Sequence, residues 1–214
     1  MPLMKELVSQ ALYSYWNGLR GDRIAPKRFE IEPSCIASHL PDTFILERLS
    51  RDVVRFRLAG TRISEAFGVD FRGVNIFDLF DEADSLVLRQ QFSLGAARGA
   101  VSVIRLKAAS PAGLATDFEL LLLPLTHTRE SIDRFLGSLV PISNPDWLGS
   151  VALTERKLLG HETIWPDGMV GHPIAPLNSQ TPPFLPVVRE AKIVRSERRQ
   201  FRVYEGGLSR PVTD

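Results

Sequence analysis

The stretch from residue 56 to residue 80 reads FRLAGTRISEAFGVDFRGVNIFDLF and constrains the fold more than any other part of the chain. Apolar residues alternate with arginines up to Gly60, as they do in a half-buried strand. A short helix is predicted at Arg62–Phe67, and Gly68 ends it. Gly73 then turns the chain into another apolar helical turn that ends at Phe80. A strand that leads into short helices interrupted by glycines favours an α+β domain.

The bulk composition is that of an ordinary globular protein. The chain has 214 residues, of which 44% are hydrophobic and 24% charged, enough for one domain with extensions or two small ones. The net charge of +1 provides no global field for nucleic acid or a membrane surface. The longest apolar run, 120–125, is far shorter than a membrane span, and the N-terminus shows no signal peptide. We therefore predict a cytoplasmic protein without membrane insertion or nucleic-acid binding.

Residues 1–22 are predicted to form an N-terminal amphipathic helix that ends at Gly18 and Gly21. Its apolar residues fall on one face at helical spacing. These residues are Leu3, Leu7, Val8, Ala11, Leu12 and Tyr15. The stripe has to pack either on the sheet of its own domain or on another chain, which is a second copy or a different partner. The pattern does not choose between these two arrangements.

Residues 23–143 are predicted to form one α+β domain with a five-stranded antiparallel sheet and helices on one face. Two strands come first, a helical stretch follows, and three strands in series complete the sheet. The predicted strands are Thr43–Leu49, Val53–Ala59, Val101–Ala109, Thr116–Thr126 and Arg134–Ile142, and the longest predicted helix is Glu82–Arg98.

Residues 144–214 are predicted to be a C-terminal extension that is partly irregular. Residues 173–186 are rich in proline and polar residues, which predicts no regular structure there. Residues 189–202 form a basic segment with five arginines and one lysine.

Several short motifs spread through the chain resemble the PAS domain family, and more narrowly a bacterial subfamily of short, stand-alone PAS proteins. The resemblance covers about residues 13–143, roughly two-thirds of the chain, and its motifs are more specific together than any one alone. They are Tyr15-Trp16 through Leu19-Arg20, Pro26-Lys27-Arg28, Ile31-Glu32-Pro33, Leu40-Pro41, Phe56-Arg57-Leu58-Ala59-Gly60-Thr61, and Gly68-Val69-Asp70 to Gly73.

The resemblance implies a five-stranded sheet with helices over one face and often a cavity between them. PAS domains use that cavity for haem, flavin or small metabolites, or leave it empty and act by protein contact. It implies a signalling role and carries no catalytic residue to this chain.

The residue types that cofactor and metal chemistry needs are missing from the expected places. The light-sensing PAS branch has a cysteine just after a glycine-x-asparagine turn, where this chain has Ile76. Cys35 lies well upstream and is interpreted as buried and inert. The helix and strand that usually supply a haem ligand, 82–109, contain neither histidine nor methionine. His161, His172 and Asp167 match no metal-ligand spacing. We predict no cofactor and no metal.

The sequence shows no catalytic motif. It contains no Gly-x-Ser-x-Gly elbow and no phosphate-binding glycine loop, and only four histidines. A nucleophile, base and acid that are distant in sequence would escape this search, so a small enzyme on a PAS-like fold stays as an alternative. We assign no catalytic residue.

Arg195 and Arg199 have the Arg-x-x-x-Arg spacing with which PilZ domains bind cyclic di-GMP. The Asp/Asn-x-Ser-x-x-Gly segment that completes this motif is missing, and too few residues follow for the barrel. The pair is a candidate anion site, and a solvated basic tail or docking segment for an acidic partner is the favoured interpretation.

Alternating apolar residues in the predicted strands are candidates for lining a ligand cavity. The same residues would equally fill a core without leaving a cavity, because a sheet face packed on helices needs about this many. The candidates are Phe44, Leu46, Val54, Phe56, Leu58, Ile104, Leu106, Phe118, Leu120 and Leu122.

These observations predict a stand-alone PAS sensor or adaptor in bacterial signal transduction. It would act by contact with a protein partner, under control of a small ligand if the cavity exists, and would form a homodimer. The alternatives are a protein that binds a small molecule or cyclic dinucleotide, and a small enzyme. Fold alone does not decide between them.

Overall fold

The computed structural model describes residues 4–127, 130–166, 193–196 and 199–202. The chain divides into two units, residues 1–171 and 172–214. In the second unit the described part is a pair of antiparallel strands, β7 (Ile193–Ser196) and β8 (Arg199–Arg202). None of the helices within the described ranges has the length and hydropathy that crossing a membrane requires.

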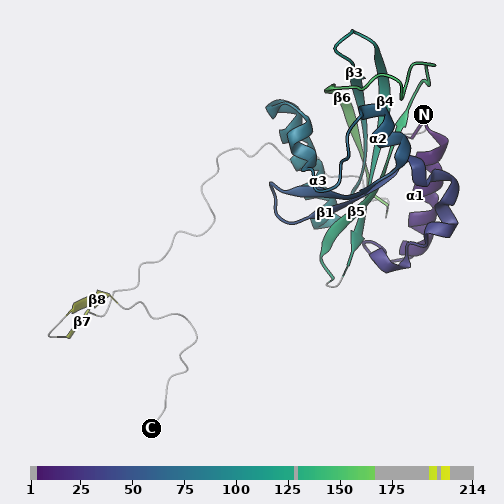
Figure 1. Cartoon of the computed structure of the whole chain (residues 1–214). Helices are drawn as coiled ribbons and strands as arrows, with labels where there is room; N and C mark the ends of the chain where they lie inside the picture. The colour runs from purple at the N-terminus through teal and green to yellow at the C-terminus, as the bar shows by residue number, and fades with distance from the viewer. Residues whose placement is uncertain (1–3, 128–129, 167–192, 197–198, 203–214) are drawn as a thin grey trace. The chain divides into compact units, whose positions relative to one another are not determined.

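The first unit is a sheet of six strands with helices on both faces (Figure 1). The strand order is β2-β1-β5-β4-β3-β6, and every neighbouring pair is antiparallel. In chain order the elements are α1 (Leu7–Arg20), η1 (Arg28–Glu30), η2 (Pro33–Asp42), β1 (Thr43–Arg48), β2 (Val54–Ala59), α2 (Thr61–Phe67), η3 (Ile76–Leu79), α3 (Glu82–Arg98), β3 (Val101–Ala109), β4 (Ala115–Thr126), β5 (Ile132–Pro141) and β6 (Glu155–Ile164). The predicted α+β class with an antiparallel sheet is confirmed.

The sixth strand is a difference from the five that the sequence predicts. β6 pairs with β3 over its whole length, from Val101 opposite Ile164 to Ala109 opposite Glu155. Most of its side chains are exposed, so it lacks the apolar alternation by which a strand is recognised in a sequence. The predicted boundary after residue 143 therefore falls between β5 and β6, two strands of one sheet.

Helices α2, η3 and α3 cover the inner face of the sheet. The side chain of Asp81 caps α3 by accepting a hydrogen bond from the Asp84 N–H at 2.9 Å. Midway along α3, the Phe92 ring packs edge-on against Phe77 of η3 and Phe135 of β5, at 5.6 and 4.9 Å between centroids. Gly99 ends the helix in the left-handed conformation, with φ 67°.

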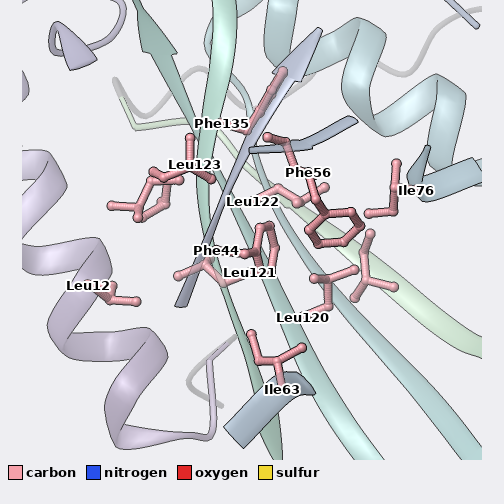
Figure 2. Packing of buried hydrophobic residues seen from close by; sticks show 14 of the residues in the cluster. Leu12, Phe44, Phe56, Ile63, Ile76, Leu120, Leu121, Leu122, Leu123 and Phe135 are labelled. Atoms are coloured by element: carbon pink, nitrogen blue, oxygen red, sulfur yellow. The ribbon is translucent and has the colours of Figure 1, made fainter. Parts of the chain in front are cut away.

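Helix α1, the predicted N-terminal amphipathic helix, covers the opposite, outer face. Its buried residues include Leu12 and Trp16, and Figure 2 shows Leu12 reaching from α1 towards the strands. Trp16 Nε1 donates a hydrogen bond of 2.7 Å to the Pro124 carbonyl. The carboxylate of Glu119, which is 1% exposed, accepts hydrogen bonds from the Lys5 and Glu6 N–H groups, at 2.8 and 3.3 Å. One side of α1, which includes Leu12 and Trp16, thus packs on its own domain.

The buried centre of the sheet leaves no room for a side chain at Gly137. A Cβ there would overlap the Phe44 ring and the Leu121 carbonyl. We expect Gly137→Ala to lower the free energy of unfolding by about 1–3 kcal/mol or more, because overpacking a core forces backbone shifts. Gly18→Ala is the matched control, since a Cβ at this helical position would meet nothing within 4 Å. It should raise the free energy of unfolding by about 0.5–1 kcal/mol. Urea denaturation measures both changes, and equal effects would contradict this packing.

Glu6 gives a second test of how α1 packs. Burial, and after it the charge of Glu119, raise the pKa of the Glu6 carboxyl. The folded chain therefore holds this proton more tightly than the unfolded chain, and stability rises as the pH falls through the raised pKa. We expect Glu6→Gln to stabilise the protein at pH 7, with an advantage that shrinks as the pH falls to about 4, the ordinary glutamate range. A pH-independent difference in melting temperature would contradict this account.

Candidate functional site

A small cavity lies between the inner face of the sheet and the helices that cover it. Its volume is about 30 Å³, which accommodates about one or two water molecules. Ligand sites for small molecules usually measure about 300–1,000 Å³. The cavity lining is almost entirely apolar and comes from the strands, α2 and the segment 71–80.

Phenylalanine rings fill the space around this cavity. Phe44 contacts Phe56 at 5.6 Å between ring centroids, and Phe56 contacts Phe71 at 5.1 Å. Phe67 continues the series, 5.8 Å from Phe71 and 5.4 Å from Phe118. The rings connect β1, β2, α2 and β4 in one run, and Figure 2 shows Phe44 and Phe56 beside each other in this core. Edge-to-face and tilted ring pairs of this kind fill space densely.

The ten residues predicted to line a ligand cavity fall into four groups in the structure. Phe44, Phe56, Leu106 and Leu120 line the small cavity. Phe118 lines a separate, larger cleft, whereas Leu46, Val54, Ile104 and Leu122 are buried in the core. Leu58 is 51% exposed and belongs to neither.

A β-bulge explains the exposure of Leu58. Leu46 pairs with Phe56 and the next residue back, Ile45, pairs with Leu58, so Arg57 is the extra residue of β2. One inserted residue moves the following side chain to the opposite face of the sheet. Strict alternation in the sequence places Leu58 on the inner face of the sheet. The structure corrects this prediction, because the bulge turns Leu58 to the opposite face.

Sequence reasoning missed the residues on the helical side of the cavity, one residue of β5 and one cation. Ile63, Phe67, Phe71, Ile76, Leu79, Phe80, Leu139 and Arg156 also line it. The apolar residues between 61 and 80 were the available signal, because they had to pack on the sheet. Ile76 stands in the cavity at the position where the light-sensing PAS branch has its cysteine, and an isoleucine offers no thiol for a flavin adduct.

Arg156 of β6 connects the sixth strand to the rest of the domain. Its Nη1 and Nη2 donate to the carbonyls of Thr154 and Leu153, at 3.3 and 3.2 Å. The guanidinium carbon lies 4.8 Å from the centroid of the Phe67 ring, a cation–π contact. Burial lowers the pKa of this guanidinium. Its Nε is buried without a hydrogen-bond partner in the described structure.

A much larger cleft of about 530 Å³ opens where α2 meets the end of β5 and the loop that follows. Ile63 and Leu139 line both the cleft and the small cavity, and so form the wall between them. The lining also includes Val8, Asp42, Arg62, Glu65, Ala66, Phe118, Val140, Pro141, Asn144, Leu148 and Gly149. Polar and apolar side chains thus meet in a space of the size that holds a small molecule.

An ion pair stands at this cleft. Arg62 Nη1 donates to Asp42 Oδ2 at 2.7 Å. Asp42 is 4% exposed, whereas most of the Arg62 side chain is exposed. A buried carboxylate needs such a partner, because burying an unpaired charge is costly. Asp42 therefore holds the guanidinium at the cleft.

The predicted partner surface of α1 is divided by the way the helix packs. Leu7 is 79% exposed and Ala11 is exposed, whereas Leu12 is fully buried. Val8 and Tyr15 are half-buried, and Leu3 lies outside the described residues. The buried face is offset from the predicted stripe, since it runs through Ser9, Leu12, Trp16 and Arg20.

The remaining candidate groups do not form a reactive cluster in the described part of the chain. No group of three or more His, Cys, Asp or Glu residues is placed there to hold a metal ion. Cys35 is exposed in η2 rather than buried as predicted, because its short helix presents it to solvent. Arg195 and Arg199 have their backbones in β7 and β8. Their side chains, and His172 and Asp167, lie outside the described residues.

Comparisons with known proteins give one family and several distant structures. A model of the PAS domain family matches residues 4–140. No curated protein matches the chain. An RNA-binding light-oxygen-voltage receptor is similar at 15% identity and a TM-score of 0.41, over 55% of this chain and 35% of its own. The d2 variant of RsLOV is similar at 18% identity and a TM-score of 0.39, over 49% and 61%.

A light-oxygen-voltage domain studied with a flavin analogue is also similar, at 12% identity and a TM-score of 0.40, over 55% of this chain and 87% of that one. The chain thus spans about a third and three-fifths of the first two structures. Similarity at this level carries nothing about light, flavin or RNA to this chain.

Truncation of Ile63 tests whether this side chain separates the cleft from the small cavity. We expect Ile63→Ala to join the two spaces and to lower the free energy of unfolding by about 2–4 kcal/mol, since Ile63 is 3% exposed and its removal leaves a void. Leu86→Ala is the control, because Leu86 is exposed on α3 and its truncation should change stability by no more than about 0.5 kcal/mol. Urea denaturation measures both, and a cost at Ile63 no larger than at Leu86 would refute the wall.

Proposed function

The chain belongs to the PAS domain family, and from that premise we propose that it is a signalling adaptor that acts by contact with another protein. PAS domains are generally signal-sensing modules and are typically sensory rather than catalytic. They also commonly mediate protein interactions. The finer role, transmission through a surface rather than through a bound cofactor, is the part we propose.

The observation that carries this proposal is the filled interior of the domain. The run of phenylalanines from Phe44 to Phe118 leaves about 30 Å³. A haem or flavin needs many times that volume, and close-packed interiors do not expand without cost. An interior of this kind supports a role for the surface of the domain.

Helix α1 supplies the surface that fits a protein partner best. Its inner side is held by Trp16, Leu12 and the hydrogen bonds from Lys5 and Glu6 to Glu119. Its outer side presents Leu7 and Ala11 to solvent beside the half-buried Val8. A helix anchored on one side and apolar at an exposed end suits docking of an amphipathic partner helix, which uses i, i+3 and i+4 anchors. The partner is either a signalling protein or a second copy of the chain.

The other functions weighed from the sequence have less support in the described residues. Cyclic-dinucleotide binding through Arg195 and Arg199 depends on side chains that the structure does not describe, and it stays a prediction. Ligand control through the small cavity would require the phenylalanine rings to move apart. A small enzyme would need a reactive cluster, for which the described residues offer no specific observation.

Site-specific photocrosslinking tests the proposal with the full chain in cells of its native host. A photoreactive residue is placed at Leu7 on α1 and, as the matched control, at the exposed Leu86 on α3. We expect a covalent adduct with one protein, or with a second copy, from position 7 and none from position 86. Ala11→Asp should reduce the yield from position 7 by about tenfold, which corresponds to about 1.4 kcal/mol of binding free energy.

The same experiment can overturn the proposal. Absence of any adduct from position 7, or equal adducts from both positions, would rule out the outer side of α1 as a partner surface. Circular dichroism of each variant shows that the fold is retained, and this is expected because Leu7, Ala11 and Leu86 are all exposed.

A further inference from the structure

The cleft beside α2 carries charges of both signs above an apolar floor. Ile63, Ala66 and Phe118 are buried and form part of its lining, and Leu148 borders it. Asp42, Arg62 and Glu65 line the same space, together with the neutral Asn144. With one cation and two carboxylates, the charged side chains of the lining sum to one negative charge. A volume of about 530 Å³ leaves ample room for a small molecule.

Asp42 and Arg62 each keep unused hydrogen-bonding capacity at the cleft. Their bond joins Arg62 Nη1 to Asp42 Oδ2, and within the described residues Asp42 Oδ1 has no partner. A guanidinium has five N–H donors in a rigid fork, so four remain on Arg62. Asp42 Oδ1 is not among the buried side-chain atoms that lack a partner, so it is open to the cleft and can accept a further hydrogen bond there.

Glu65 lies one helical turn after Arg62 and has no ion-pair partner in the described structure. Residues three apart lie on one side of a helix, so the guanidinium and the second carboxylate flank the cleft together. A purely anionic ligand would meet repulsion from Asp42 and Glu65. A purely cationic ligand would meet repulsion from Arg62.

We propose that this cleft binds a free amino acid with an apolar side chain. The ligand carboxylate accepts hydrogen bonds from the free N–H groups of Arg62, since arginine binds carboxylates in a bidentate manner. The ligand ammonium donates to Asp42 and Glu65, and the side chain packs on Ile63, Phe118 and Leu148. A zwitterion with an apolar group therefore pairs with the charges of both signs and also contacts the apolar floor of the cleft. Ile63 and Leu139 separate this site from the small cavity inside the domain, and Val8 of α1 lies at its border.

Isothermal titration of the full chain with L-leucine and L-phenylalanine tests the proposal. We expect saturable binding of at least one of them. N-acetyl-L-phenylalanine lacks the ammonium and L-phenylalanine amide lacks the carboxylate, and each should bind at least about tenfold more weakly than the parent if both charged groups are recognised.

Two substitutions locate the site. Arg62→Gln and Glu65→Gln should each weaken binding by about tenfold or more, the loss of a charge-assisted hydrogen bond. Arg72→Gln and Glu82→Gln are the matched controls, because both residues are exposed and outside the cleft lining, and should leave affinity unchanged. Arg62→Gln leaves the Asp42 carboxylate without its ion-pair partner, so its melting temperature is measured as well. Glu65 is exposed, and Glu65→Gln therefore reports on binding with the fold intact.

Three results would overturn the proposal. The first is no saturable binding of either amino acid at millimolar concentration. The second is equal binding of the acetylated, amidated and free forms, which would mean recognition by the apolar floor alone. The third is binding that neither Arg62→Gln nor Glu65→Gln weakens.

Discussion

The contact between the Phe44 ring and Gly137 is the constraint on which the rest of this domain depends. The two residues face each other across β1 and β5, and a Cβ at Gly137 would occupy the space of the ring. Phe44 then contacts Phe56, which contacts Phe71, and the run of rings reaches α2 and β4. The positions of β2 and α2 relative to the central strands follow from this packing.

The same packing explains why the inside of the domain offers so little to a ligand. Rings that support one another at close to van der Waals distance leave a space for one or two waters, and interiors of this density respond poorly to insertion. The surfaces that we propose for binding therefore lie at the margins of the sheet. One is the outer side of α1, and the other is the cleft between α2 and the loop after β5. Val8 of α1 lines that cleft next to Leu7, so the two surfaces adjoin.

Several elements of the fold were predictable because each follows from local rules. The helix at residues 82–98 and the strand at residues 101–109 have the bounds that the sequence pattern predicts, and in the structure Asp81 caps this helix and Gly99 ends it. β6 was missed because an edge strand with exposed side chains has no apolar pattern. Leu58 was misplaced because a bulge breaks the alternation on which its assignment depended. Cys35 was taken for a buried thiol from its residue type, although it stands exposed.

The candidate site was predictable only in part. The amino-acid sequence specified the order of strands and helices, the PAS resemblance and the apolar residues of the sheet, because these depend on periodicity and on residues close together in the chain. The cleft could not be read in this way. Asp42, Arg62, Glu65 and Asn144 come from η2, α2 and the loop after β5. They meet because the antiparallel pairing of β1 with β2 and with β5 brings the ends of these segments together. The filling of the interior likewise follows from how the rings interlock in space, which the spacing of phenylalanines along the chain does not specify.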